Sequence, residues 1–341
     1  MTDPVIVIVW LVFAHLVADF VLQNDWIAIN KGSGTRTGYA ALLVHGGHVT
    51  LCLLPVVVVF GVPGVVYVLV VATSHLFVDR WKVKATRRAE VNGQAAARKR
   101  IAAGAPSTPS GLGAAWTPAP GILFVADQAL HLTFAIVGWL VILEGAPPTQ
   151  LFVDFSNALF GDWDRRMVHA VIMTGVLLTS LFIVNTRGAY YLVLALVSPR
   201  EIGPDPAAPP VAVVPVPAPT GYTVRVGPIV ATVEPSTVTD GDDRSREPVS
   251  GTPPLAANSV PMGAPARIGA TIGALERLLI VTFVLTRTEA LIGFVIAAKT
   301  LARFRQLDDR GFAEYYLLGT LASVTVAIIS GLVALAALST L

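Results

Sequence analysis

The sequence predicts an all-α membrane protein, a polytopic bundle of about eight transmembrane helices in two modules of five and three. Its 341 residues are 54% hydrophobic and only 13% charged, with a mean hydropathy of +0.68, whereas soluble domains are about 25% charged. The apolar residues form continuous runs close to the ~20 residues that a helix needs to cross a bilayer. These runs lack the alternation that the strands of a membrane barrel would show.

Eight apolar segments are long enough, or nearly so, to span a bilayer. The first carries His15 and Asp19 where a signal peptide would be purely apolar, so we expect it to be a retained helix. The sixth and seventh are joined by few polar residues, so these two segments could instead form a re-entrant hairpin. The segments lie at residues 4–22, 39–60, 63–81, 121–143, 167–186, 268–286, 289–304 and 314–339.

The distribution of Lys and Arg predicts the orientation, because cytoplasmic loops carry an excess of both. Residues 82–120 are rich in both and are expected to form a cytoplasmic loop, which places both termini outside. Residues 199–265 hold 15 of the 24 prolines and predict a disordered cytoplasmic linker. The sequence also allows a small hairpin at residues 222–233 within this linker. The predicted domains are an N-terminal module at 1–198, this linker, and a C-terminal module at 266–341.

Ionisable residues inside the spans are the candidate functional residues, because they are costly in a bilayer. His and Asp occur four residues apart in AHLVADF, SHLFVDRW and DQALHL, and VHGGH holds two histidines three apart. Both spacings place the side chains on one helix face. At 1.5 Å per residue, four spans contribute to one layer roughly 10 Å below the cytoplasmic surface. The favoured set is His15, Asp19, His45, His75, Asp79, Asp127 and His131.

Imidazole and carboxylate groups together predict a site for one or two divalent metal ions, namely zinc, manganese or iron. The single cysteine, Cys52, excludes an intramolecular disulfide and a cysteine zinc site. His48 ranks below the other histidines because no carboxylate follows it four residues later. Two alternatives stay open: hydrogen-bonded core histidines without an ion, and an interfacial ion pair between Asp79 and Arg80.

The C-terminal module adds basic residues. Arg277, Lys299 and Arg303 predict a clamp for a phosphate or another anion beside the metal layer. The alternative is that Arg277 pairs with Glu276 or Glu314, while Lys299 and Arg303 anchor helix ends at the membrane surface.

The segments AHLVADFVLQNDW, ALLVHGGHVTL, SHLFVDRWKVK and DQALHL resemble the N-terminal module of the bacterial membrane protein family of unknown function 3307. The tail, IGALERLLIVTFVLTRTEALIGFVIAAKTLARF and then AEYYLLGT, resembles the second module of its full-length members. The resemblance covers about residues 1–140 and 266–341. It implies a multi-pass protein of a bacterial inner membrane and brings no assigned activity. The His/Asp motifs are also similar, more distantly, to those of membrane-bound metal-dependent hydrolases.

The function that the sequence favours is a membrane-embedded metal-dependent hydrolase, in which the ion activates water and Asp19 or Asp79 serves as general base. The bilayer surrounds the protein, and a lipid-linked phosphate is the expected substrate. The net charge of +2 argues against a nucleic-acid partner. Three alternatives remain: transport of protons or divalent cations, haem binding by paired histidines, and a scaffold that an ion only cross-links.

Overall fold

The chain divides into two compact units, Met1–Ile202 with Ala256–Leu341, and Gly203–Leu255. The structure is a computed structural model. It describes residues 4–104, 111–202, 222–226, 229–233 and 264–339. In the second unit, strands β1 (Tyr222–Val226) and β2 (Ile229–Val233) pair antiparallel. This pairing agrees with the hairpin that the sequence allows at residues 222–233. The prediction of a disordered linker otherwise lies outside the described residues.

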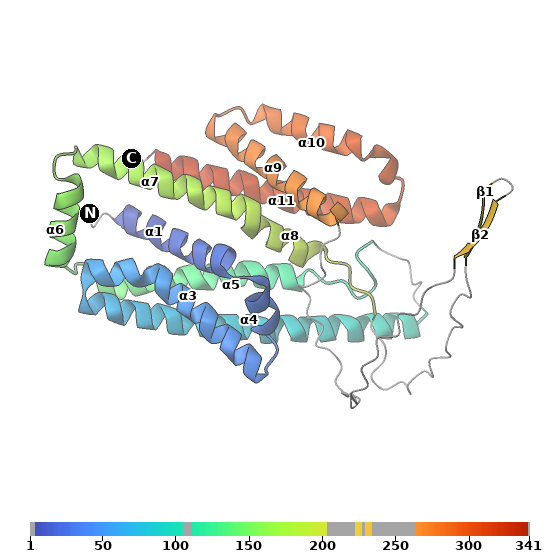
Figure 1. The fold of residues 1–341 in the computed structure, drawn as a ribbon, viewed down its shortest axis with the longest axis horizontal. Coiled ribbons are helices and arrows are strands. Elements are labelled where there is room, and N and C mark those ends of the chain that lie inside the picture. The colour runs from blue at the N-terminus through green and yellow to red at the C-terminus, as the bar shows by residue number, and fades with distance from the viewer. Residues whose placement is uncertain (1–3, 105–110, 203–221, 227–228, 234–263, 340–341) are drawn as a thin grey trace. The chain divides into compact units, whose positions relative to one another are not determined.

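Four long helices and the short α2 form the N-terminal part of the first unit (Figure 1). Thr35 caps α3, since its side chain accepts a hydrogen bond from the Gly38 amide, and Gly61 turns the chain into α4 with a φ of 63° that favours glycine. The elements are α1 (Pro4–Leu16) continued by the π-helical η1 (Val17–Leu22), α2 (Asp25–Asn30), α3 (Arg36–Phe60), α4 (Val62–Ala102), and α5 (Ala119–Gly138) continued by η2 (Trp139–Leu143).

The remaining helices of this unit pack against the first four through α1, which contacts α7, and α5, which contacts α8. The chain reverses direction between α9 and α10 and again before α11 (Figure 1). The elements are α6 (Gln150–Phe160), α7 (Arg165–Ile183) with η3 (Val184–Gly188) and α8 (Ala189–Val197), α9 (Ala264–Leu285), α10 (Ala290–Ala302), η4 (Phe304–Gln306) and α11 (Arg310–Leu338).

The predicted all-α bundle is confirmed. Seven helices within the described residues are long and apolar enough to cross a membrane, as a membrane-embedded protein requires. The predicted span at 289–304 corresponds to α10, whose 13 residues reach only about 20 Å and fall short of the ~30 Å hydrocarbon core. The exact number of spans therefore stays a prediction.

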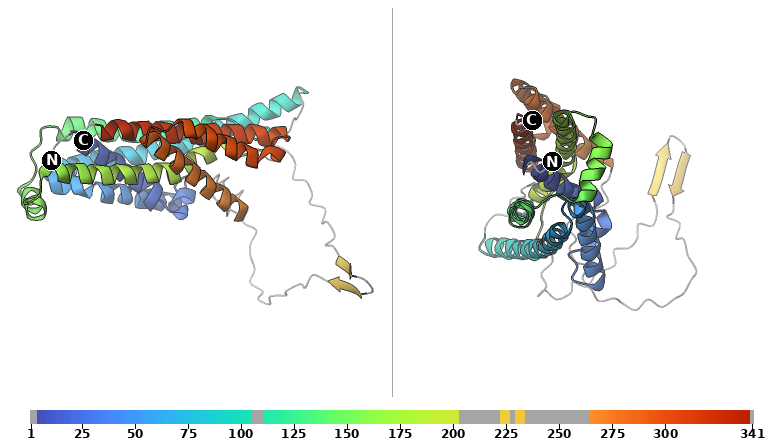
Figure 2. Two further views of the ribbon diagram at one scale, coloured as in Figure 1. Left: turned by 90° about the horizontal axis from the view of Figure 1, so that it is seen from above. Right: turned by 90° about the vertical axis from the view of Figure 1, so that its left-hand side faces the viewer.

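Residues 82–102, which we expected in a cytoplasmic loop, are helical. They continue α4 to 41 residues, and its last turns extend beyond α3 (Figure 2). This stretch consists mainly of good helix formers such as Ala, Arg, Lys, Glu and Gln, and it contains no proline. The helix therefore continues past the apolar span.

A core of apolar side chains fills the bundle on one side of the His/Asp layer. It includes Tyr67, whose hydroxyl donates to the Ala135 carbonyl over 3.0 Å, and the buried Leu53, Phe60 and Trp139. The polar layer lies at the other end of this core. One side of the layer is thus closed by packed hydrocarbon.

Candidate metal centre

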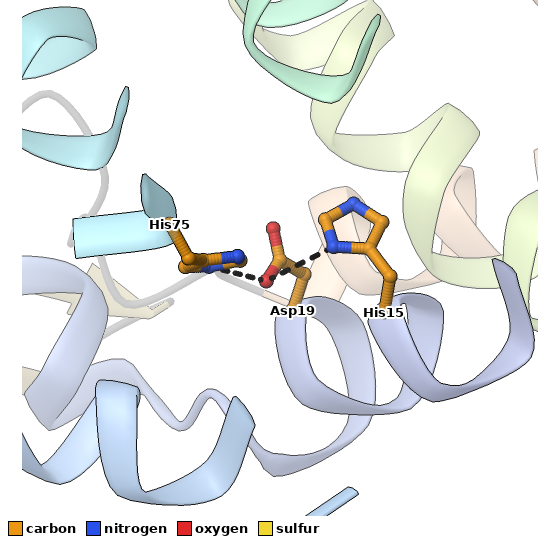
Figure 3. Close-up of side chains that lie close together, drawn as sticks. All are labelled: His15, Asp19 and His75. Carbon is orange, nitrogen blue, oxygen red and sulfur yellow. Dashed lines mark ion pairs between the residues drawn. The ribbon is translucent and has the colours of Figure 1, made fainter. Parts of the chain in front are cut away.

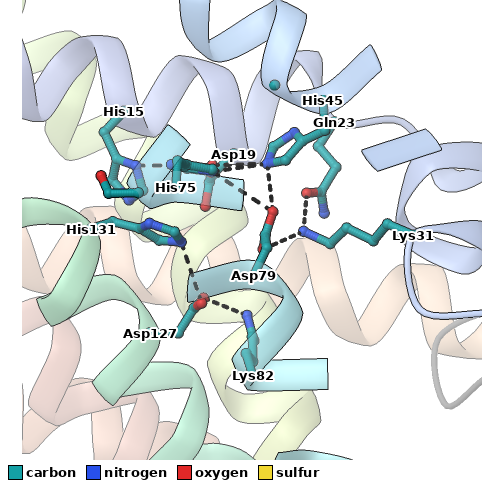
Figure 4. A network of polar contacts seen from close by, with 12 residues as sticks. His15, Asp19, Gln23, Lys31, His45, His75, Asp79, Lys82, Asp127 and His131 are labelled. Carbon is teal, nitrogen blue, oxygen red and sulfur yellow. Dashed lines mark hydrogen bonds and ion pairs between the residues drawn. The ribbon is translucent and has the colours of Figure 1, made fainter. Parts of the chain in front are cut away.

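All seven residues of the predicted His/Asp set converge inside the N-terminal bundle (Figure 4). Each is buried, and His15, the most exposed of them, is 9% accessible. Four separate helices supply the side chains. The contributions are His15 from α1, Asp19 from η1, His45 from α3, His75 and Asp79 from α4, and Asp127 and His131 from α5.

Two local features of the sequence bring these helices close together. Asp19 lies in a π-helical turn, a feature common at functional sites because it widens the helix locally. Gly46, next to His45, lets α4 approach α3, since a Cβ atom there would lie 2.9 Å from Leu76 Cδ2. The histidine of α3 therefore reaches the histidine of α4.

Three imidazoles surround one oxygen of Asp19. Asp19 Oδ1 lies 3.2 Å from His75 Nε2, 3.5 Å from His45 Nε2 and 3.9 Å from His15 Nδ1, and Figure 3 shows the contacts with His15 and His75. This oxygen is buried and has no hydrogen-bond partner among the described residues. A carboxylate oxygen among imidazole nitrogens offers the mixed donor set that a divalent metal ion favours.

Two further groups adjoin the first. His45 Nε2 lies 3.1 Å from His75 Nε2 and 3.3 Å from Asp79 Oδ2, and His131 Nε2 lies 3.3 Å from Asp127 Oδ1. The His75 and His131 rings stack with their centroids 3.8 Å apart. Three triads each bring their ligand atoms within 4.8 Å of one another. They are His15–Asp19–His75, His45–His75–Asp79 and Asp79–Asp127–His131.

The residues that the triads share limit how many ions they can hold. Asp79 belongs to two triads, and a carboxylate can bridge two ions through its two oxygens. His75 also belongs to two triads, but one imidazole nitrogen binds one ion. The two triads that contain His75 therefore compete, and the cluster has room for at most two ions.

Lys31 and Lys82, which the sequence pattern did not assign to the site, join the network (Figure 4), and Gln128 joins it as well. Lys31 Nζ donates to Asp79 Oδ1 over 2.9 Å, and Lys82 Nζ donates to Asp127 Oδ2 over 2.6 Å. Gln128 contacts His15, as well as Asp19 Oδ2 over 3.4 Å. The motif DQALHL contains Gln128 directly beside Asp127, which is a signal that could have identified it.

Lys31 lies outside the spans, between α2 and α3. Burial lowers the pKa of its ammonium, but the carboxylates of Asp79 and Asp19 outweigh burial and raise the pKa above its usual value. Lys31 therefore carries a charge at neutral pH and neutralises Asp79. Within the described part of the chain, Asp19 forms no salt bridge with a lysine or arginine.

A small cavity of about 20 Å³ adjoins the cluster on its apolar side. Its lining includes His15, His75 and His131, together with aliphatic side chains of the core. A volume of this size is enough for one water molecule. The imidazoles thus border a space in which a single water could sit.

The predicted anion clamp is not brought together by the contacts that the structure describes. Arg277 Nε donates to the Asn185 carbonyl over 2.5 Å, and its Nη1 donates to Ser323 Oγ over 3.1 Å. Lys299 pairs with Glu276 over 2.5 Å. Arg303 donates to Gln306 at the surface. Each basic residue has its own partner, and the clamp stays a prediction.

The alternative ion pair of Asp79 with Arg80 is replaced by the pair with Lys31. Arg80 points to the outside of α4, where it donates to the Tyr39 hydroxyl over 3.2 Å. His48 is only partly buried and takes no part in the described contacts of the cluster. Its lower ranking in the sequence analysis agrees with this position.

A sequence profile of the family described as "Protein of unknown function (DUF3307)" matches residues 7–159, so this part of the chain is similar to that family. The match contains every residue of the His/Asp cluster. It does not include residues 266–341, so the resemblance of the tail stays a prediction. No curated protein and no solved structure matches the chain.

Proposed function

We propose that this protein binds a divalent metal ion in the His/Asp cluster, which lies in the part of the chain that resembles the DUF3307 family. The observation that carries the proposal is Asp19, a buried carboxylate with three imidazoles around one oxygen and no salt bridge to a lysine or arginine among the described residues. An uncompensated charge at this depth costs several kcal/mol. A cation between Asp19 and the histidines removes that cost.

Charge balance supports the same position. The cluster holds three carboxylates, and lysines neutralise Asp79 and Asp127. With neutral histidines, one negative charge therefore remains, and it belongs to Asp19. We infer that the triad His15–Asp19–His75 binds the first ion. Zinc, manganese and iron are the metals that a mixed imidazole and carboxylate site favours.

We further propose that the bound ion serves hydrolysis. An ion of this kind activates water for attack on an ester or anhydride bond. The water-sized cavity beside His15 and His75 offers a place for that water. Asp79 Oδ2, like Asp19 Oδ1 and Asp127 Oδ1, is buried without a hydrogen bond among the described residues. Because Asp19 is assigned to the ion, and because Asp79 shares a triad with His75 whereas Asp127 does not, we assign the role of proton acceptor to Asp79. The leaving group would take a proton in turn.

Ion or proton transport is the alternative, and the apolar core disfavours it. Transport needs polar groups that continue across the bilayer. On one side of the cluster, however, the bundle is filled by Leu53, Phe60, Tyr67 and Trp139. The cluster is thus closed on that side within the N-terminal bundle, as suits a site that serves substrates from the other face.

Hydrolysis is tested with purified protein loaded with zinc, manganese or iron, using p-nitrophenyl phosphate and phosphatidic acid in mixed micelles. We expect metal-dependent release of phosphate or nitrophenol, and a loss of at least a hundredfold in Asp19→Asn, since this variant keeps the shape and removes the charge. His48→Gln, three residues after His45 on α3 but outside the triads, is the matched control and should retain activity. If the protein binds metal but turns over neither probe, the hydrolysis proposal is wrong and the ion only stabilises the helices.

A further inference from the structure

The outer side of the seam between α4 and α5 carries an apolar groove of about 700 Å³. Leu69, Phe77 and Trp81 line it from α4, and Leu130 and Phe134 line it from α5. Phe77 is 70% exposed, so the groove opens outward from the bundle. In a membrane-embedded protein this surface faces lipid.

The same face of α4 becomes basic where the apolar stretch ends. Lys84 follows Phe77 by seven residues, and Arg88 follows Trp81 by seven, which places all four side chains along one face of the helix. Both basic residues are exposed. Tryptophan typically marks the boundary between hydrocarbon and head groups. The groove therefore leads from apolar side chains, past Trp81, to two positive charges.

We propose that this groove binds an anionic phospholipid, with an acyl chain along α4 and α5 and the head group against Lys84 and Arg88. Basic residues next to a membrane span attract anionic head groups. A second transmembrane helix fits less well, because helix interfaces favour small residues, and only Thr73 and Ser74 of the nine residues that line this groove are small. The proposal does not depend on the metal site, since no residue of the His/Asp cluster lines the groove.

The test measures quenching of Trp81 fluorescence by lipids brominated in their acyl chains. The protein is placed in phosphatidylcholine vesicles that contain a minor fraction of brominated phosphatidylglycerol or, in a parallel sample, brominated phosphatidylcholine. The Trp81 signal is the difference between the wild type and Trp81→Phe. We expect stronger quenching by the anionic lipid. Each basic residue contributes roughly a fivefold preference, so Lys84→Gln with Arg88→Gln should abolish most of it.

The matched control is Lys99→Gln with Arg100→Gln, which removes two charges from the same helix farther from the groove. It should keep the preference. Equal quenching by the two lipids would overturn the proposal and indicate annular lipid only, and an equal loss in the control would indicate diffuse charge attraction. If Trp81→Phe does not fold, native mass spectrometry of retained phosphatidylglycerol in the two double variants decides the same question. Metal content, measured on each sample, keeps this result separate from that for the cluster.

Discussion

Replacing His75 with alanine is expected to abolish metal binding. His75 belongs to two of the three triads, lies 3.2 Å from Asp19 and 3.1 Å from His45, and stacks on His131. Loss of an outer partner of a ligand already lowers metal affinity 10- to 100-fold. Loss of a ligand shared by two triads should therefore lower it by more than a hundredfold, as measured by titration of the apoprotein in detergent.

The same substitution should also lower stability, because it removes the hydrogen-bond partner of the buried His45 ring. Leaving a buried polar group unsatisfied costs about 1–3 kcal/mol. His48→Ala is the control, since His48 lies on α3 three residues from His45 but outside the triads. The account is contradicted if His75→Ala binds metal as the wild type does, or if His48→Ala loses it equally.

Replacing Lys31 with methionine should produce a large loss of stability. Its ammonium lies 2.9 Å from Asp79, and the two side chains are 12% and 1% exposed. Breaking a buried ion pair by removing one partner costs about 3–5 kcal/mol, because the other charge stays buried and unpaired. The free energy of unfolding, measured by denaturant titration in detergent micelles, should fall by about this amount.

A double variant distinguishes the charge from the packing of the side chain. Lys31→Met combined with Asp79→Asn should recover more than half of the loss, since no unpaired charge then remains. Lys99→Met, at an exposed position of α4, should change stability by less than about 0.5 kcal/mol. A double variant as unstable as Lys31→Met alone would show that the lysine contributes mainly through its packing.

The His/Asp cluster was predictable because helical spacing and depth are both regular. His75 and Asp79 are four residues apart, as are Asp127 and His131, and counting residues along the spans placed them in one layer. The structure confirms this convergence. The partners from other elements were less predictable. Lys31 lies in a turn, where its charge also fits the general excess of cytoplasmic lysines, and only the tertiary structure brings it to Asp79.

Other features depend on contacts that no periodicity reveals. The π-helical turn that holds Asp19 has no simple sequence signature. The partner of Arg277 is the Asn185 carbonyl in another π-helical turn, whereas a carboxylate would be expected from charge alone. The helical end of α4 is different, since its composition favours a helix and positive charge alone led us to assign a loop.

X-ray absorption at the metal edge of the loaded wild-type protein would identify the ligands of the bound ion. A His/Asp metal centre predicts nitrogen and oxygen ligands at about 2.0–2.2 Å, no sulfur, and the multiple-scattering pattern of at least two imidazoles. Asp19→Asn should lose that spectrum. Two results would contradict a metal site in the His/Asp cluster. One is a folded wild type that retains no zinc, manganese or iron. The other is a bound ion that has only oxygen ligands and a spectrum unchanged in Asp19→Asn.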